Sequence, residues 1–208
     1  MFRQLIARLM GSADPEHVPD AGLHEIRGFR VVVENSRPDI ATRDVLRRLD
    51  EALALIERYQ PWRFRHLQRD LEQFWVVRYP CRGAYLPDER TCMTELTFLA
   101  RRDITAAPVA SSILHEGVHA RVDRMGVQRE GRDRAREERL CRRAELDFGR
   151  SLPAEFGAPV VERALQSLTL ADDEVAPVID WSEAMQRTGD VDRAAAQDRA
   201  RGTPDAAM

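Results

Sequence analysis

The chain has no lysine, so all of its 32 basic residues are arginine. The 35 acidic residues leave a formal net charge of −3. A balance of this kind argues against a strongly basic nucleic-acid-binding protein. Arginine-rich runs are a weak signal here, because the bias covers the whole chain. We interpret the arginine-rich stretch 121–143 as a solvated helical face, since its acidic residues nearly balance it, and we expect no nucleic acid among the partners.

Cysteine is also scarce, and the three present are Cys81, Cys92 and Cys141. Their number is odd and no two of them form a CxxC pair. The pattern therefore predicts neither a cysteine-based zinc site nor a disulfide framework. We expect free thiols in a cytoplasmic protein, with Cys141 packed as a small apolar residue.

Long hydrophobic runs are absent as well. The first ten residues, MFRQLIARLM, are amphipathic but lack the continuous apolar run of a signal peptide, and they are too short to cross a bilayer. Short amphipathic helices more often pack on their own domain than on a membrane. Membrane contact through residues 1–10 is therefore the less favoured alternative.

The length and composition indicate one globular domain with short extensions. The 208 residues fit a single domain, and the 43% hydrophobic and 32% charged residues are typical of a soluble protein. We predict an N-terminal segment over 1–26, a domain over 27–187 and a flexible C-terminal tail over 188–208, where the sequence is small and polar.

The elements predicted along the chain are of both kinds. Periodicity and β-branched content predict strands over 28–34, 74–79 and 91–99, and helices over 41–59, about 109–122, 129–150 and, with an interruption, 154–187. We expect loops over 11–24 and 81–90. Together these elements predict a small α+β domain in which a short sheet packs against the helix at 109–122.

That helix carries the sequence SSILHEGVHAR, residues 111–121. On a helical wheel its polar residues form one stripe and the remaining surface is almost entirely apolar. A mostly apolar helix is buried, and buried polar side chains need partners or a bound ion. A stripe that contains two histidines and a glutamate therefore suggests a metal site.

The spacing of the two histidines has a physical basis. His115 and His119 lie one turn apart on the same helical face, so both imidazoles can reach one ion. Glu116 follows the first histidine and lies to the side of such an ion, where it can accept a proton from metal-bound water. The alternative is a structural pair of core histidines, and we favour the metal site because the helix is buried.

A catalytic zinc ion takes a third protein ligand and leaves a position for water. Glu138 follows His119 after 18 intervening residues. Over about 103–150 the sequence thus resembles the gluzincins, zinc metallopeptidases whose third ligand is a glutamate on a following helix. The resemblance implies a zincin-like fold, Zn²⁺ bound by His115, His119 and Glu138, and Glu116 as general base. It also implies that the strand 91–99 lies along an extended substrate. The run around the motif is similar to that of small bacterial zincin-like proteins too.

The sequence departs from that family at one position. Thermolysin-like members carry an acidic residue four positions after the ligand glutamate, where this chain has Arg142. Glu145, on the same helical face, is a candidate to hold a ligand histidine instead. Glu137 remains an alternative third ligand, because it shares the apolar seam with Cys141.

The group that stabilises an oxyanion is left open, with four candidates: Tyr79, Tyr85, Arg142 and Arg143. From these residues we expect a zinc-dependent hydrolase that cleaves an amide bond in a peptide or protein. The alternative is a zincin-shaped structural or regulatory domain without hydrolytic activity, which either uses zinc only to fix its fold or binds a partner without metal.

Overall fold

The computed structural model describes residues 20–126 and 134–202. The described residues divide into two units, a first that ends at Val178 and a second that begins at Ile179. The amphipathic segment predicted over 1–10 lies outside the described residues. In the second unit, helix α9 spans Trp181–Gly202, so the tail predicted from residue 188 is helical as far as Gly202, and residues 203–208 lie outside the described residues.

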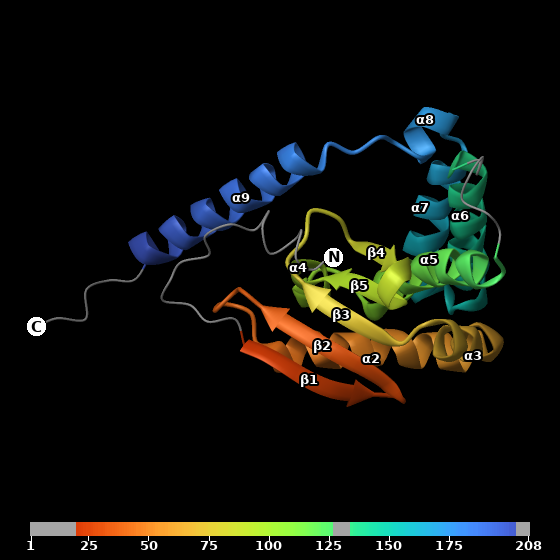
Figure 1. Cartoon of the computed structure of the whole chain (residues 1–208), viewed down its shortest axis with the longest axis horizontal. Coiled ribbons are helices and arrows are strands. Elements are labelled where there is room, and N and C mark those ends of the chain that lie inside the picture. Colours follow the sequence, from red (N-terminus) through yellow and green to blue (C-terminus); the bar gives the residue numbers. More distant parts are fainter. Residues whose placement is uncertain (1–19, 127–133, 203–208) are drawn as a thin grey trace, which may run out of the picture. The chain divides into compact units, whose positions relative to one another are not determined.

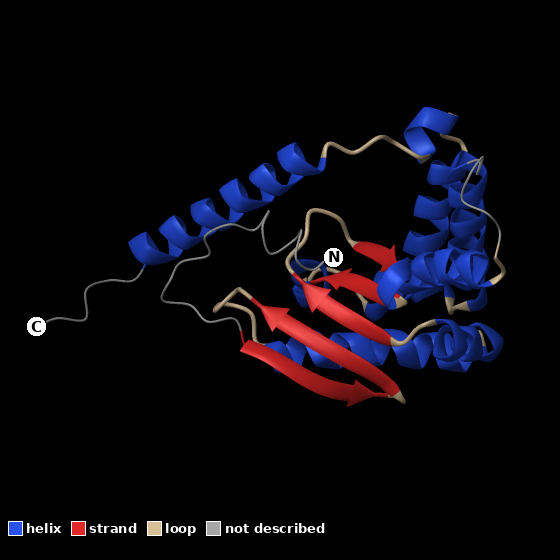
Figure 2. Cartoon of the chain, in the orientation of Figure 1, coloured by secondary structure: helices blue, strands red, loops and turns tan. Residues whose placement is uncertain are grey.

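The first unit contains a mixed five-stranded sheet with the order β1-β2-β3-β5-β4 (Figures 1 and 2). β1 and β2 are antiparallel, β2, β3 and β5 run parallel, and β4 is antiparallel to β5. The strands span Asp20–Ile26, Phe29–Asn35, Gln73–Val77, Gly83–Leu86 and Thr91–Glu95 for β1 to β5. Helices and a mixed sheet in one unit confirm the predicted α+β class.

β1 is a strand where the sequence predicts a loop and a segment outside the domain. It pairs along its whole length with β2 through a two-residue turn, in which Arg27 and Gly28 both have positive φ, at 49° and 78°. Such turns match the natural twist of a hairpin. The residues from Asp20 to Ile26, which the sequence analysis placed in the N-terminal segment, thus form a strand of the sheet.

The core lies between the sheet and two helices. α2 (Thr42–Tyr59) and α3 (Pro61–Asp70) follow β2 and cover one face of the sheet (Figure 1). Pro61 occupies the first turn of α3, as expected where a helix cannot continue from the preceding one. The α2 residues in this core, all fully buried, are Val45, Leu49, Ala52, Leu53 and Ile56.

Two predictions for residues 81–99 need correction. The segment 81–90, predicted as a loop, contains β4 and a short 3-10 helix, Pro87–Glu89. The strand predicted over 91–99 ends at Glu95, whose carboxylate accepts the Phe98 N–H at 2.6 Å and caps helix α4 (Leu96–Ala100). An N-cap carboxylate at this position stops the strand and starts the helix.

The helices that follow carry the motif residues. α5 spans Ala106–Arg124, α6 Arg134–Ser151, α7 Ala154–Leu168 and α8 Asp172–Val175. α5 packs against α2, α6 and β4, and α6 packs against α7. The helix predicted over 109–122 is confirmed within α5.

α6 and α7 approach closely at two glycines. A Cβ atom on Gly157 would overlap the Gly149 carbonyl oxygen, and a Cβ on Gly149 would lie 2.9 Å from Val161 Cγ2. The crossing therefore depends on the absence of side chains at both positions. It fixes α6, which presents its other faces to α5.

We expect Gly157→Ala to lower the free energy of unfolding by about 1–3 kcal/mol, because the added methyl group forces the two helices apart. The sign of the change in stability is the test, because a glycine-to-alanine substitution at an open helical position raises the free energy of unfolding by up to about 1 kcal/mol. Gly189→Ala in α9 is the matched control, because its Cβ would meet only the Arg193 guanidinium, at 3.3 Å. Urea unfolding of both variants gives the comparison, and unchanged or higher stability of Gly157→Ala would contradict the packing argument.

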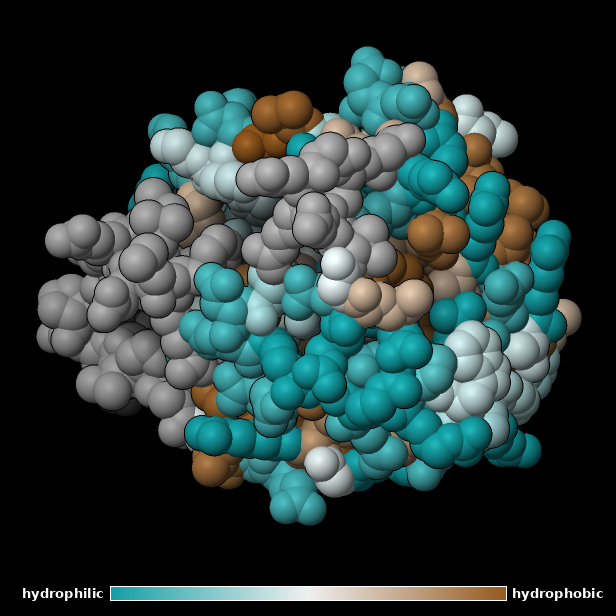
Figure 3. All heavy atoms as spheres, turned by 45° about the vertical axis from the view of Figure 1, so that its right-hand side comes forward, coloured by the Kyte–Doolittle hydropathy of each residue, from teal (hydrophilic) through white to brown (hydrophobic). Residues whose placement is uncertain are grey.

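On the face seen in Figure 3, hydrophilic side chains predominate among the described residues, and hydrophobic ones form separate patches. None of the described helices has the length and apolar character that crossing a bilayer requires.

Candidate metal centre

The motif histidines lie in the middle of α5, which begins with a Thr105 cap whose hydroxyl accepts the Ala107 N–H. His115 and the glutamate that follows it are buried, at 8% and 7% exposure, and His119 is partly buried. The apolar remainder of the helix fills the core between α2 and α6. The polar stripe predicted from the sequence therefore lies inside the protein, where its side chains need partners.

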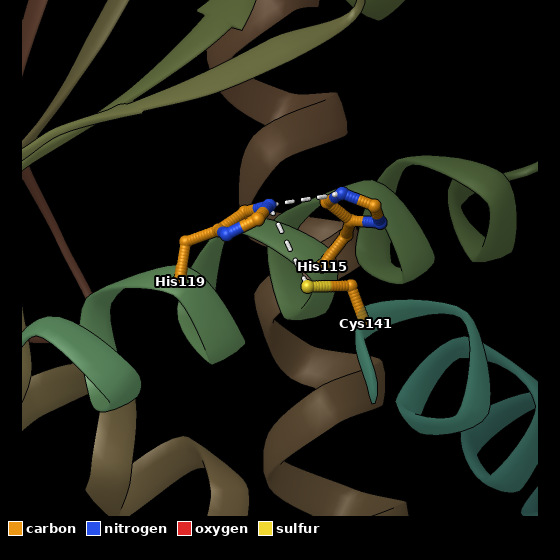
Figure 4. Close-up of side chains that lie close together, drawn as sticks. All are labelled: His115, His119 and Cys141. Carbon is orange, nitrogen blue, oxygen red and sulfur yellow. Dashed lines mark hydrogen bonds between the residues drawn. The ribbon is translucent and has the colours of Figure 1, made fainter. Parts of the chain in front are cut away.

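The two imidazoles turn their Nε2 atoms toward one another, 3.3 Å apart (Figure 4). Each outer nitrogen is held by a glutamate of α6. His115 Nδ1 hydrogen-bonds Glu145 Oε1 at 2.7 Å, and His119 Nδ1 hydrogen-bonds Glu137 Oε1 at 2.8 Å. Histidines that ligate a metal are commonly oriented by a carboxylate in this way, with the inner nitrogen left for the ion.

Glu138 and Glu137 take different positions beside this pair. The Glu138 carboxylate lies at the inner nitrogens, with Oε2 3.2 Å from His115 Nε2 and Oε1 3.4 Å from His119 Nε2. Glu137 lies at the outer nitrogen of His119. Of the two candidates left open by the sequence, Glu138 is thus the one beside the inner nitrogens, and Glu137 is the one beside the outer nitrogen of His119.

Cys141 joins the same group from α6. Its side chain is fully buried, and Sγ lies 3.5 Å from His119 Nε2 (Figure 4). The ligand atoms of Cys141, His115 and His119 lie within 4.8 Å of one another, and this group can hold a metal ion. The sequence analysis treated Cys141 as a packing residue. It lies one turn after Glu138 on α6, and the packing of α6 on α5 brings it to the histidines.

The electrostatics of the group favour a cation. Burial opposes the charged imidazolium of His115, but hydrogen bonds with Glu138 and Glu145 outweigh it and raise its pKa to about 10. Burial likewise opposes charge on His119, and contacts with Cys141, Glu137 and Glu138 raise its pKa. The carboxylates that retain protons on the imidazoles are the groups that would stabilise a divalent ion in their place.

Glu145 is nearly inaccessible, at 2% exposure, and three groups surround its carboxylate. Oε2 accepts the Ser111 hydroxyl at 3.1 Å, and Oε1 accepts Arg142 at 2.7 Å as well as His115 Nδ1. Burial raises the pKa of Glu145, but His115 and Arg142 outweigh it, so the net shift is downward. The contact expected for Glu145 with a motif histidine is thus present.

We expect Glu145→Gln to weaken zinc binding by about tenfold, the lower end of the effect of losing such an orienting carboxylate. Glutamine keeps the size of the side chain but loses the charge that aligns His115. Competition with a chromophoric chelator measures the affinity. Glu155→Gln, at an exposed position of α7, is the control, and equal affinities of the two variants would show that Glu145 does not orient the histidine.

Glu116 lies on the α5 face turned toward β4. A Cβ atom built on Gly83 would lie 3.2 Å from Glu116 Oε1 and 3.2 Å from Ser112 Oγ. The absence of a side chain at Gly83 thus gives the carboxylate room beneath the strand. Glu116 is also among the charges that raise the pKa of His115.

The four residues that are candidates to stabilise an oxyanion lie in four different environments. Tyr85, on β4, donates its hydroxyl to Asp123 Oδ2 at 3.1 Å, one turn beyond His119. Tyr79 is buried, and burial together with Cys81 raises its pKa to about 12. Arg142 binds Glu145. Arg143 lines a pocket of 360 Å³ between α3, α5 and α6, on helix faces turned away from the histidine pair, and is thereby removed from the candidates.

Comparisons of the chain with protein-family models, with curated proteins and with solved structures returned no match. The donor set itself is informative. Two imidazole nitrogens, a carboxylate and a thiol are the ligands that zinc takes in proteins, whereas Mg²⁺ and Ca²⁺ prefer oxygen alone. The residues present therefore fit a transition-metal ion, the class to which zinc belongs by its ligand preferences.

Proposed function

We propose that the chain is a zinc-dependent hydrolase that cleaves an amide bond in a peptide or protein, with a gluzincin-type centre. The observation that supports it best is the pair of facing Nε2 atoms, 3.3 Å apart, with each outer nitrogen held by a glutamate. His115, His119 and Glu138 are the proposed ligands. Bound zinc would polarise the substrate carbonyl and lower the pKa of a bound water.

Glu116 is the proposed general base. Its carboxylate lies under β4 beside Gly83, on the turn of α5 that carries the histidine pair, where it would accept the proton of the attacking water and return it to the leaving amine. Its burial at 7% exposure keeps bulk water away from this transfer.

The proposed substrate strand differs from the one that the sequence suggested. β5 pairs with β3 on one side and with β4 on the other, and all five of its residues are buried. It therefore cannot receive an extended peptide, and the prediction for 91–99 is wrong. β4 is one of the two edge strands of the described sheet, and it is the one that packs against α5. We assign the peptide to this edge, where backbone hydrogen bonds would hold it beside Glu116.

A second candidate is a structural or regulatory domain in which metal only fixes the fold. The observation that favours it is Cys141 Sγ, 3.5 Å from His119 Nε2. With Glu138 and the two histidines it makes four protein donors, the number that structural zinc sites use.

The first experiment is the zinc content of the purified protein, measured by elemental mass spectrometry before and after zinc reconstitution. About one zinc per chain is expected. Peptide-library hydrolysis by the zinc-loaded protein then distinguishes the hydrolase from the structural alternative. No bound zinc after reconstitution would reject both and leave the histidine pair as a structural feature of the core.

A further inference from the structure

The Cys141 thiol has a position that packing alone does not explain. It is fully buried, yet it faces a polar group of imidazoles and carboxylates and lies 3.5 Å from His119 Nε2. We propose that Cys141 is a fourth protein ligand, so that the resting metal centre is closed to water and the hydrolase is latent. This inference rests on the metal centre of the proposed function.

The distances between donor atoms support four-fold ligation. A tetrahedral zinc with ordinary bond lengths separates two ligand nitrogens by about 3.3 Å and a nitrogen from a sulfur by about 3.6 Å. The structure has 3.3 Å between the two Nε2 atoms and 3.5 Å between His119 Nε2 and Cys141 Sγ. Glu138 Oε2 lies 3.2 Å from His115 Nε2. The separations between the two Nε2 atoms and from His119 Nε2 to the thiol match one tetrahedral ion, and the two imidazoles and Cys141 Sγ all lie within 4.8 Å of one another. The Glu138 carboxylate adjoins both inner nitrogens, with its other oxygen, Oε1, 3.4 Å from His119 Nε2.

Helix geometry explains why the carboxylate and the thiol come together. His115 and His119 are one turn apart on α5, and Glu138 and Cys141 are one turn apart on α6. The two helices pack face to face, so each contributes two donors to the space between them. An orientation of α6 that presents Glu138 to the histidines presents Cys141 as well.

The charge of the ligands gives a second reason to include the Cys141 thiolate among them. Two neutral imidazoles, one carboxylate and one thiolate carry two negative charges, which balance a divalent ion in a buried site. Without the thiolate the first sphere would carry one uncompensated positive charge. A thiolate also selects zinc over the oxygen-preferring divalent ions.

Ligation by Cys141 would block catalysis in the resting protein. Four protein ligands fill the tetrahedral sphere, and a hydrolytic water needs one of those positions. The form that hydrolyses is therefore one in which Cys141 has left the metal, and removal of the sulfur opens the position permanently. We expect Cys141→Ala, loaded with zinc, to hydrolyse peptides faster than the wild type.

The test uses the full chain with cobalt(II) in place of zinc, because a thiolate bound to cobalt gives a charge-transfer band in the near ultraviolet. The wild type is expected to show this band at one cobalt per chain. Cys141→Ala and Cys141→Ser should bind cobalt without it, and should bind zinc at least about tenfold more weakly. Cys81→Ser and Cys92→Ala are the controls and should keep the band.

Three results are informative. The band in the wild type and its loss in both Cys141 variants support the proposal. Stoichiometric cobalt without the band in the wild type overturns Cys141 ligation and leaves the hydrolase with three protein ligands. No bound cobalt and no bound zinc reject the metal centre itself, and with it both proposals. The serine variant keeps the volume of the side chain, so the test remains decisive if the alanine variant does not fold.

Discussion

Replacement of His115 by alanine is expected to abolish the stabilisation of the protein by zinc. A ligand that binds only the folded state, present at a hundred times its dissociation constant, adds about 2.7 kcal/mol to the free energy of unfolding. The wild type should gain about this amount. His115→Ala should gain nothing, because one imidazole and the alignment of Glu145 are lost together.

The quantity to compare is the zinc increment, the gain in the free energy of unfolding when zinc is added, measured by urea unfolding of zinc-free and zinc-loaded protein. The absolute stability of each variant is not the criterion. Truncation of His115 leaves the buried Glu145 carboxylate with Ser111 and Arg142 alone, so the metal-free variant will also be less stable. The increment separates the two effects. His119→Ala should behave in the same way.

His66→Ala is the matched control, since His66 lies on α3 and lines the pocket between α3, α5 and α6. It should keep the full zinc increment. If His115→Ala kept the increment too, zinc would bind elsewhere, and the pair of facing imidazoles would be a structural feature of the core.

The sequence predicted those elements whose own residues determine them. The β-branched run of β2 and the apolar periodicity of α2 agree with the structure within a residue or two, as does the stop at Pro61. β1, with the sequence DAGLHEI, has little strand propensity of its own. It is a strand because β2 pairs with it, and pairing between strands is information that a local window does not contain.

The helix in the tail was missed because the prediction used composition and not helix propensity. From residue 188 the sequence is small and polar, which was interpreted as a sign of mobility. The same residues, rich in alanine and arginine, are good helix formers, and α9 runs through them to Gly202. Composition alone did not separate these two outcomes.

At the site, spacing along α5 was enough to group His115, Glu116 and His119, because one helix turn places them. The contribution of α6 was not fixed in this way. Glu137 and Glu138 are neighbours about 100° apart on the helix, and which of them faces the inner nitrogens depends on how α6 is rotated. That rotation is set by packing against α5 and α7, including the close approach at Gly149 and Gly157, and it is invisible in the sequence of α6.

The same rotation brought Cys141 into the group. The absence of a CxxC pair argued against a cysteine ligand, but that argument applies to sites built from cysteines alone. A single cysteine added to a histidine pair leaves no spacing motif, and only the packing of two helices places it.

Replacement of Glu116 by glutamine is the change that separates hydrolysis from metal binding. The amide keeps the shape of the side chain beside Gly83 but accepts no proton from water. We expect turnover to fall by about 10²–10⁴-fold, the usual contribution of a general base. Zinc content and the free energy of unfolding should stay near those of the wild type, because Glu116 contacts neither inner nitrogen in the proposed ligand set.

Peptide-library hydrolysis, followed by mass spectrometry and expressed per bound zinc, gives the comparison. It should be made in the wild type and in Cys141→Ala, since a closed centre would hide the effect in the former. Glu138→Gln is the contrasting variant, which should lose zinc affinity along with activity. Turnover in Glu116→Gln equal to that of its parent would reject Glu116 as the base. Absence of hydrolysis in both zinc-loaded parents would make the centre structural, with α5 and α6 joined through the metal.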